Sequence, residues 1–461
     1  MTAAADGGPA WAAAHAVELC AAEGGCVAVA DELSAAHFRW AANAPTTSGA
    51  TIGRRLTVAA IAGSATGVAA RHGDWSEESV AELVAAATSL AREAPPAPDA
   101  QPLVLPRGTV RRGSAERSAA RAWDRLGALL PGLNIAFERA RRRENLLSGY
   151  AEHQLRTSCV ASSTGLRLHH VQPTGVFDLT SMRPDQQASA WAGSASPDFA
   201  GPAAMAEALD ERLSRPVRRA TLPHGPYEVL IPPSGVADLM LHLYEALSAQ
   251  DAYSGQSVFS GPDGTTRLGE RLTDFPLTLY SDPDEPGLQC APFVIARGST
   301  AAASVFDNGF PLARTDWITD GALTALAHTR ASAAARGLRC TPEIGNLVLR
   351  GPDRGRGLDE MIADTERGLL LTSLWYLRDV DPRSLLLTGV TRDGVYLVER
   401  GKVTAAVPDF RFNESPVALL GRVAEVGRTE PALPREWGDC FARMSMPALR
   451  IRDFAVVSAA S

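Results

Sequence analysis

One face of a predicted helix over residues 234–249 carries side chains that could bind a metal ion. Asp238, His242 and Glu245 recur there at spacings of four and three residues, which places them on one side of a helix. A histidine and a glutamate three positions apart can hold a cation, so His242 and Glu245 form a candidate metal pair. The interpretation that we favour is a solvated or interface face on which two acidic residues flank a histidine.

A second candidate cluster consists of His153, His169 and His170 on two adjoining predicted strands. Neighbouring residues of a strand face opposite sides, so His169 and His170 cannot both point toward His153. At most one pair could form, and two ligands leave a zinc site incomplete. We therefore interpret these histidines as structural. A serine nucleophile is not indicated either, because Gly255-Gln256-Ser257 lacks the glycine that completes a G-x-S-x-G turn.

The composition is that of a soluble globular protein with room for two or three domains. The 461 residues are 45% hydrophobic and 21% charged. A net charge of −7 argues against a nucleic-acid partner, which usually meets a basic face. The six cysteines form no C-x-x-C pair, and no apolar stretch approaches the length of a membrane span. Without an evident signal peptide, the protein is predicted to be cytoplasmic.

The pattern of helices and strands predicts an α+β protein. An N-terminal domain combines helices with an antiparallel sheet, and a C-terminal domain is rich in antiparallel strands. A proline-rich stretch reading APPAPDAQPLVLPRG separates the first unit from the rest of the chain. The predicted division is an N-terminal α+β domain (1–93), a linker (94–113), a central helix and strand region (114–220) and a strand-rich C-terminal domain (221–461).

Turn signals near the C-terminus predict a strand meander followed by a helix. Asp393-Gly394 lies between two apolar runs, as in a hairpin turn, and Gly401-Lys402 separates a third strand. Ser415 and Pro416 are typical of a helix start, and Gly427 is suited to its end. Three further helices are expected, near 234–249, 322–336 and 358–370.

This order of motifs resembles the C-terminal domain of the TldD/PmbA peptidase family. The resemblance rests on TGVTRDGVYLVERGKVTAAV, on DFRFNESPVALL and on MPALRI, and weaker similarity covers nearly the whole chain. The FRFNESP and EWGD segments look most like the TldE/PmbA branch, whose members do not carry zinc. Members of the family work as pairs in which one subunit carries the metal.

The resemblance implies a zinc motif that this chain lacks. Zinc-bearing subunits carry H-E-x-x-x-H on a helix and a downstream cysteine. Here Leu243 follows His242 where the glutamate should be, and Ala246 and Leu247 stand where a second histidine would be. Cys440 lies too close to the MPALRI strand to match the family's cysteine. No catalytic residue, cofactor or metal ligand is therefore expected in this chain, with His242 and Glu245 as the fallback pair.

The function implied by the resemblance is that of a catalytically silent subunit. Its partner would be a TldD-like zinc metallopeptidase, and the pair would cleave unfolded peptides or a peptide-like biosynthetic intermediate. Exposed strand edges could accept such a peptide through main-chain hydrogen bonds. Two alternatives stay open, namely a stand-alone metal-dependent hydrolase and a non-enzymatic binding or regulatory protein. Neither a nucleic acid nor a membrane is expected as a partner.

Overall fold

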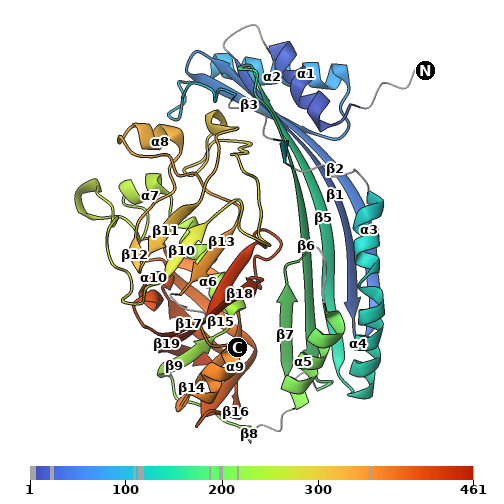
Figure 1. Ribbon diagram of the computed structural model, residues 1–461, viewed down its shortest axis with the longest axis vertical. Coiled ribbons are helices and arrows are strands. Elements are labelled where there is room, and N and C mark those ends of the chain that lie inside the picture. Colours follow the sequence, from blue (N-terminus) through green and yellow to red (C-terminus); the bar gives the residue numbers. More distant parts are fainter. Residues whose placement is uncertain are drawn as a thin grey trace.

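Two large sheets, one from each half of the chain, organise the computed structural model (Figure 1). The structure describes residues 7–20, 25–106, 111–112, 119–185, 188–196, 201–214, 218–351 and 355–459. Both sheets carry helices, and the predicted α+β class with an N-terminal antiparallel sheet and a strand-rich C-terminal domain is confirmed. Within the described residues, no helix is both long and apolar enough to cross a lipid bilayer.

The N-terminal sheet contains seven strands within the described residues, in the order β3-β2-β1-β5-β6-β4, with β7 also on β6. All its pairings are antiparallel except that of β4 with β6. Its elements are α1 (Pro9–Cys20), β1 (Cys26–Ala41), β2 (Ala44–Ala62), β3 (Ala65–His72), α2 (Glu77–Glu93), β4 (Arg111–Arg112), α3 (Ala119–Gly127), α4 (Leu130–Arg142), β5 (Leu146–Ser162), β6 (Arg167–Met182), β7 (Ser189–Ser194) and α5 (Pro202–Ser214).

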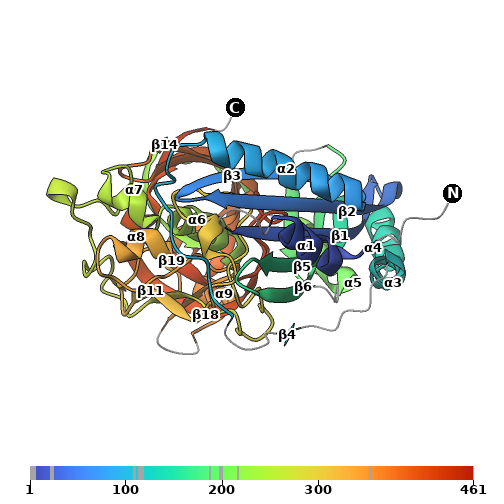
Figure 2. The same cartoon turned by 90° about the horizontal axis from the view of Figure 1, so that it is seen from above.

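Alternation along β1 shows how this sheet is buried on both faces. Ala28 and Ala30 point into the core beneath α1 and α2. Val27 and Val29 point the other way and contact Phe293 of the C-terminal half. Figure 1 shows the long strands standing between the C-terminal body and helices α3 and α4, and Figure 2 shows α1 and α2 across one end.

The C-terminal sheet contains twelve strands within the described residues and is mostly antiparallel. β19 pairs with four other strands and so lies at its centre. The elements are β8 (Arg218–Arg219), β9 (Gly225–Ile231), α6 (Pro233–Glu245), α7 (Ala249–Tyr253), η1 (Pro262–Gly264), β10 (Thr278–Ser281), η2 (Val305–Asp307), β11 (Thr315–Thr319), β12 (Ala322–Leu323), α8 (Arg330–Ala334), β13 (Leu347–Arg350), α9 (Leu358–Ala363), β14 (Arg367–Asp381), β15 (Leu386–Glu399), β16 (Lys402–Val407), β17 (Phe410–Glu414), α10 (Pro416–Leu420), β18 (Val423–Ala432) and β19 (Met444–Ala459).

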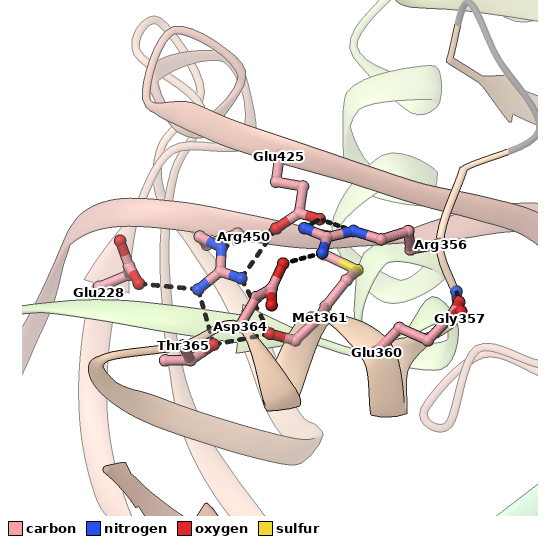
Figure 3. Close-up of polar contacts among 9 residues, drawn as sticks. All are labelled: Glu228, Arg356, Gly357, Glu360, Met361, Asp364, Thr365, Glu425 and Arg450. Carbon is pink, nitrogen blue, oxygen red and sulfur yellow. Dashed lines mark hydrogen bonds and ion pairs between the residues drawn. The ribbon is translucent and has the colours of Figure 1, made fainter. Parts of the chain in front are cut away.

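A buried arginine joins several of these elements (Figure 3). Arg450 of β19 lies 2.9 Å from Glu425 of β18 and 3.0 Å from Glu228 of β9. It also donates to the Thr365 hydroxyl and to the Met361 carbonyl, at 2.6 and 2.9 Å. A guanidinium offers five donors in a fixed fork, so one side chain can hold β9, β18 and the end of α9 together.

One sheet combines strands from both predicted segments 1–93 and 114–220, since β1 pairs with β5 along its length. The four-part division of the chain stays a prediction. Residues 107–110 and 113 of the predicted linker, and 114–118, 186–187, 197–200 and 215–217 of the central region, lie outside the described residues.

The predicted hairpin at Asp393-Gly394 is wrong. β15 continues through both residues, which have φ values of 60° and 119°, and the register to β14 shifts opposite them. An Asp-Gly pair tolerates positive φ in a β-bulge as well as in a turn, so the local signal was ambiguous. The turn between β14 and β15 lies at residues 382–385 instead. The predicted turn at Gly401 is confirmed, formed by Arg400 and Gly401.

The predicted helices are shorter than expected. The helix that begins at Pro416 ends at Leu420, and Gly427 lies within β18 rather than at a helix end. The segment 322–336 contains β12 before the short α8, and 358–370 contains α9 followed by the start of β14. In both segments, some apolar residues whose spacing fits a helix belong to a strand instead, because the large sheet buries them equally well.

Candidate functional site

Helix α6 is the element to which the sequence assigned the candidate ligands. It begins at Pro233, a residue type preferred in the first turn, and ends at Glu245, and Pro232 separates it from β9. Every residue from 235 to 244 is buried, so the helix lies inside the C-terminal core. We favoured a solvated or interface face, but Asp238 and His242 are only 0% and 7% exposed and lie within the chain's own core, whereas Glu245 is exposed at the helix end.

Asp238 is a fully buried carboxyl that faces the backbone N–H groups of Arg435 and Glu436. Its Oδ1 accepts a hydrogen bond from the Glu436 backbone N–H at 3.2 Å, while Oδ2 has no hydrogen-bond partner among the described residues. Burial raises the pKa of Asp238 to about 8, against the smaller opposing effect of nearby backbone N–H groups. At neutral pH this side chain is mainly protonated and uncharged.

His242 lies one helical turn further along α6 and approaches a residue of β14. Its Nδ1 is 3.7 Å from Asp379 of β14, and its Nε2 is buried without a hydrogen-bond partner in the described chain. Burial lowers the pKa of His242, although Asp379 and Glu436 oppose the shift. The imidazole is therefore neutral near pH 7. An uncharged histidine with one free nitrogen could serve as a ligand, but only with further ligands beside it.

Glu436, from the EWGD segment, holds this region together. Its backbone N–H binds Asp238, its carboxylate accepts from the Leu377 N–H at 2.8 Å, and it forms an ion pair with Arg378. One residue thus connects the loop after β18 to both α6 and β14. Sequence reasoning used the segment only as a family signature and missed this role, because the contacts span 58 residues or more.

The acidic groups at the end of α6 are shifted toward their neutral forms. Glu245, Glu343 and Cys440 are exposed side chains, but neighbouring protein atoms displace part of the water around their ionisable groups. This desolvation, with Asp379 nearby, raises the pKa of Glu245, and with Glu245 nearby it raises the pKa of Glu343 to about 7. It also raises the pKa of the Cys440 thiol. Within the described residues, His, Cys, Asp and Glu side chains nowhere gather in a group of three or more that could hold a metal ion.

The second histidine cluster does not assemble. In the pairing of β5 with β6, His153 lies opposite Gly175, whereas His169 and His170 lie opposite Cys159 and Ser158, five or six residues further along β5. His170 instead binds Gln172 at 3.0 Å. The structural interpretation of these residues agrees with this arrangement. The Ser257 hydroxyl donates to the Ala246 carbonyl at 2.7 Å and is buried, so it is not presented as a nucleophile.

A polar cleft lies between the two halves of the chain, and no sequence motif indicated it. Its open space measures about 1310 Å³, and β5, β6 and the loops around 290–297, 342–345 and 439–443 line it. Glu343 and Cys440 belong to its lining and also adjoin Glu245, so the end of α6 borders the cleft. Arg297, also in the lining, binds the buried Asp31 through two hydrogen bonds of 2.6 Å and joins the halves.

Comparison with known proteins identifies the family. Residues 224–458 match the family model described as the PmbA/TldA metallopeptidase C-terminal domain. The chain belongs to this family. The match covers α6 and the whole C-terminal sheet from β9 almost to its end, and it confirms the TldD/PmbA resemblance found in the sequence. Among curated protein sequences, none matches the chain significantly.

Solved structures share the fold over nearly the full length of this TldD/PmbA family member. TldE from Thermococcus kodakarensis has a TM-score of 0.80 at 16% identity, covering 97% of this chain and 100% of that one. A putative modulator of a DNA gyrase from Thermotoga maritima has a TM-score of 0.74 at 15% identity, covering 94% and 96%. A putative modulator of DNA gyrase from Bacteroides thetaiotaomicron has the same score and identity, covering 97% and 98%.

Proposed function

We propose that this chain is the TldE-like subunit, without zinc, of a two-subunit metallopeptidase. A TldD-like partner would carry the zinc and the catalytic glutamate. This chain would close the chamber and hold the substrate, an unfolded peptide or a peptide-like biosynthetic intermediate. The family match and the similarity to TldE support the choice of family and partner.

The observation that carries the proposal is the packing of α6. Leu243 and Leu247 occupy the positions where the zinc-bearing subunits have the glutamate and the second histidine, and both are 0% exposed. They belong to the main C-terminal core. A catalytic zinc needs at least three protein ligands and an open position for water. The end of α6 and the turn after it hold buried leucine side chains at the corresponding positions, so they cannot supply these ligands.

The protonation states beside α6 support the same conclusion. A carboxyl group must be ionised to bind a metal, and burial keeps Asp238 protonated at neutral pH. The fallback pair of His242 and Glu245 would need Glu245 in its charged form, whereas desolvation and the neighbouring Asp379 both raise the pKa of this side chain. Assembling these groups around a cation would require side-chain movement that the buried helix resists.

An exposed apolar surface next to α6 offers a place for the partner. Tyr376, Val380 and Trp437 are 51%, 56% and 38% exposed. The ion pair between Arg378 and Glu436 brings the β14 segment and the loop with Trp437 together. Exposed aromatic and aliphatic side chains of this size are typical of protein interfaces. The proposed heterodimer interface thus lies beside the helix that lacks the zinc motif.

The test is co-expression with a TldD-like protein that carries H-E-x-x-x-H. We expect a heterodimer by light scattering that cleaves an unstructured peptide, with each chain weak or inactive alone. A complex in which the partner's motif glutamate is replaced by glutamine should assemble but not cleave. Cleavage by this chain alone, abolished by a chelator, would favour the stand-alone hydrolase. A stable partner that is not a peptidase would favour the binding or regulatory protein.

Metal analysis provides an independent measurement. The purified chain should contain well under one zinc per molecule, and His242→Ala should leave that content unchanged. A full equivalent of zinc that is lost in His242→Ala would contradict the proposal, even if the heterodimer forms.

A further inference from the structure

Arg443 is a partly buried cation that forms no ion pair with a carboxylate of the described residues, although Glu343 and Asp439 line the same cleft. It lies just before β19, and its guanidinium donates a hydrogen bond to the Thr174 hydroxyl of β6. Burial lowers the pKa of Arg443, the Cys290 thiol opposes this, and Arg156 lowers it further. A buried guanidinium without a counter-ion is costly, and an adjacent second arginine adds to that cost.

Arg156 comes from the opposite half of the chain. It lies on β5, while Arg443 belongs to the C-terminal half, and both line the cleft between the two. Among the described residues, Arg156 has no hydrogen-bond or ion-pair partner in contact, and Asp31, whose pKa it lowers from a distance, is already bound by Arg297. The cleft therefore presents two positive charges, one from each wall, that no carboxylate of the described chain contacts.

The cleft continues past Arg443 into a second space of about 590 Å³ without an acidic residue in its lining. Residues 170–175 of β6 form one of its walls. β4 pairs with β6 only at His169 and His170, and β7 pairs from Phe177 onward. Between them, residues 171–176 have no strand on that edge within the described part of the chain. The main-chain groups of such an edge can hydrogen-bond to an extended peptide, except at Pro173, which has no N–H.

We propose that Arg443 and Arg156 bind a carboxylate of a peptide that lies along residues 171–176 of β6. A guanidinium matches a carboxylate through two parallel N–H···O bonds, and the Thr174 hydroxyl fixes the orientation of the Arg443 group. The ligand then supplies a negative charge to two arginines that form no ion pair within the described part of the chain. The edge of β6 supplies main-chain contacts that do not depend on sequence, so the carboxylate sets the position of the peptide.

This inference deepens the proposed function, because it assigns the substrate-holding role to particular residues. The binding experiment uses this chain without its partner, so that the carboxylate site and the proposed function are tested independently of each other. A short unstructured peptide is prepared with a free C-terminal carboxylate and, in parallel, with a C-terminal amide. We expect calorimetry to show the free acid binding about tenfold or more tightly than the amide, as for the loss of a charged hydrogen bond.

Three variants test the assignment. Arg443→Gln should weaken binding of the acid about tenfold or more and leave the amide unaffected, and Arg156→Gln should have a smaller effect in the same direction. Arg142→Gln changes an exposed arginine of α4 and serves as the matched control, with binding unchanged. Circular dichroism and the melting temperature confirm that each variant is folded.

Several outcomes would overturn the inference. Equal binding of acid and amide would do so, as would wild-type affinity in Arg443→Gln. Inorganic phosphate that displaces the peptide while acid and amide bind alike would indicate a general anion site. If the heterodimer cleaves peptides but acid and amide are equivalent, the carboxylate site is wrong and the proposed function stands. If no peptidase partner exists but the acid is bound selectively, the proposed function is wrong and the carboxylate site stands.

Discussion

Replacing Asp238 with asparagine should remove a pH dependence from the stability of this protein. Asp238 is 0% exposed and accepts its hydrogen bond from Glu436 at 3.2 Å. Burial raises its pKa from 3.8 to about 8. Asparagine has nearly the same shape and keeps an oxygen that can accept from the Glu436 N–H, but it cannot ionise.

The sign of the effect is set by proton binding. Between pH 4 and pH 8 the folded protein keeps the Asp238 proton, whereas the unfolded chain releases it. Stability therefore falls as the pH rises through this window, with a limiting slope of about 1.4 kcal/mol per pH unit. Below the window both states are protonated, and above it both are ionised. The stabilisation is thus fully present at low pH and is lost by about pH 8.

The assay is denaturant unfolding of both proteins at pH 5, 6, 7 and 8. Other titrating groups contribute equally to the two proteins, so the difference between their unfolding free energies isolates Asp238. We expect the unfolding free energy of Asp238→Asn, relative to that of the wild type, to rise by about 1 kcal/mol per pH unit in this range. Asp124→Asn removes an exposed carboxylate of α3 and controls for the change in net charge. Parallel curves for wild type and Asp238→Asn would refute the reasoning.

Three further predictions concern stability. Leu243→Ala should lower the unfolding free energy by about 2–5 kcal/mol, because the residue is fully buried. Glu245 is exposed, so Glu245→Ala should change the unfolding free energy by no more than about 0.5 kcal/mol. Equal effects of the two substitutions in denaturant titrations would contradict this. Arg450→Met should cost about 3 kcal/mol because it leaves Glu228 without this ion pair and Glu425 with Arg356 alone, and an unchanged melting temperature would show the network to be dispensable. Arg297 holds the pKa of Asp31 below its usual value despite burial, so the stability from this pair is present above pH 4 and is lost as the pH falls further. Arg297→Ala should reduce the decrease in melting temperature between pH 4 and lower pH. An unaltered decrease would exclude the pair as its cause.

Local sequence patterns predicted those features that depend on neighbouring residues. The turn at Gly401 and the helix start at Pro416 result from backbone preferences that act within a few residues. The helix near 234–249 was predicted because helical periodicity is visible in sequence, and α6 lies there. The family was recognised because many weak positions recur in a fixed order. These are local or collective signals, and they do not need the tertiary structure.

The predictions that failed depend on distant contacts. Asp393-Gly394 has the composition of a turn, but the Asp393 carboxylate accepts a hydrogen bond from Ser189 at 2.8 Å and pairs with Arg435, and these contacts fit a bulge within β15. Trp191 and Trp375 lie on the Arg435 guanidinium at 4.9 and 5.4 Å. The contact between Ser189 and Asp393 crosses 204 residues and leaves no trace in a short window. The same reason explains why the cleft arginines were missed.

Burial of α6 connects these observations to the proposed division of labour between two subunits. A helix that holds a catalytic zinc must keep one face open to water and substrate, since the metal needs a free coordination position. In this chain Leu243 and Leu247 belong to the core, and Asp238 and His242 are buried with them in uncharged forms. Restoring only the glutamate and histidine would place a charge and a ligand where the core has no space or water for them. Recovery of zinc binding would therefore require repacking against β14 and the Glu436 loop as well. We expect the double variant Leu243→Glu with Leu247→His to unfold at a lower temperature than the wild type and to bind no stoichiometric zinc. A folded double variant that binds one zinc would show that the site, and not the packing around it, is all that this chain lacks.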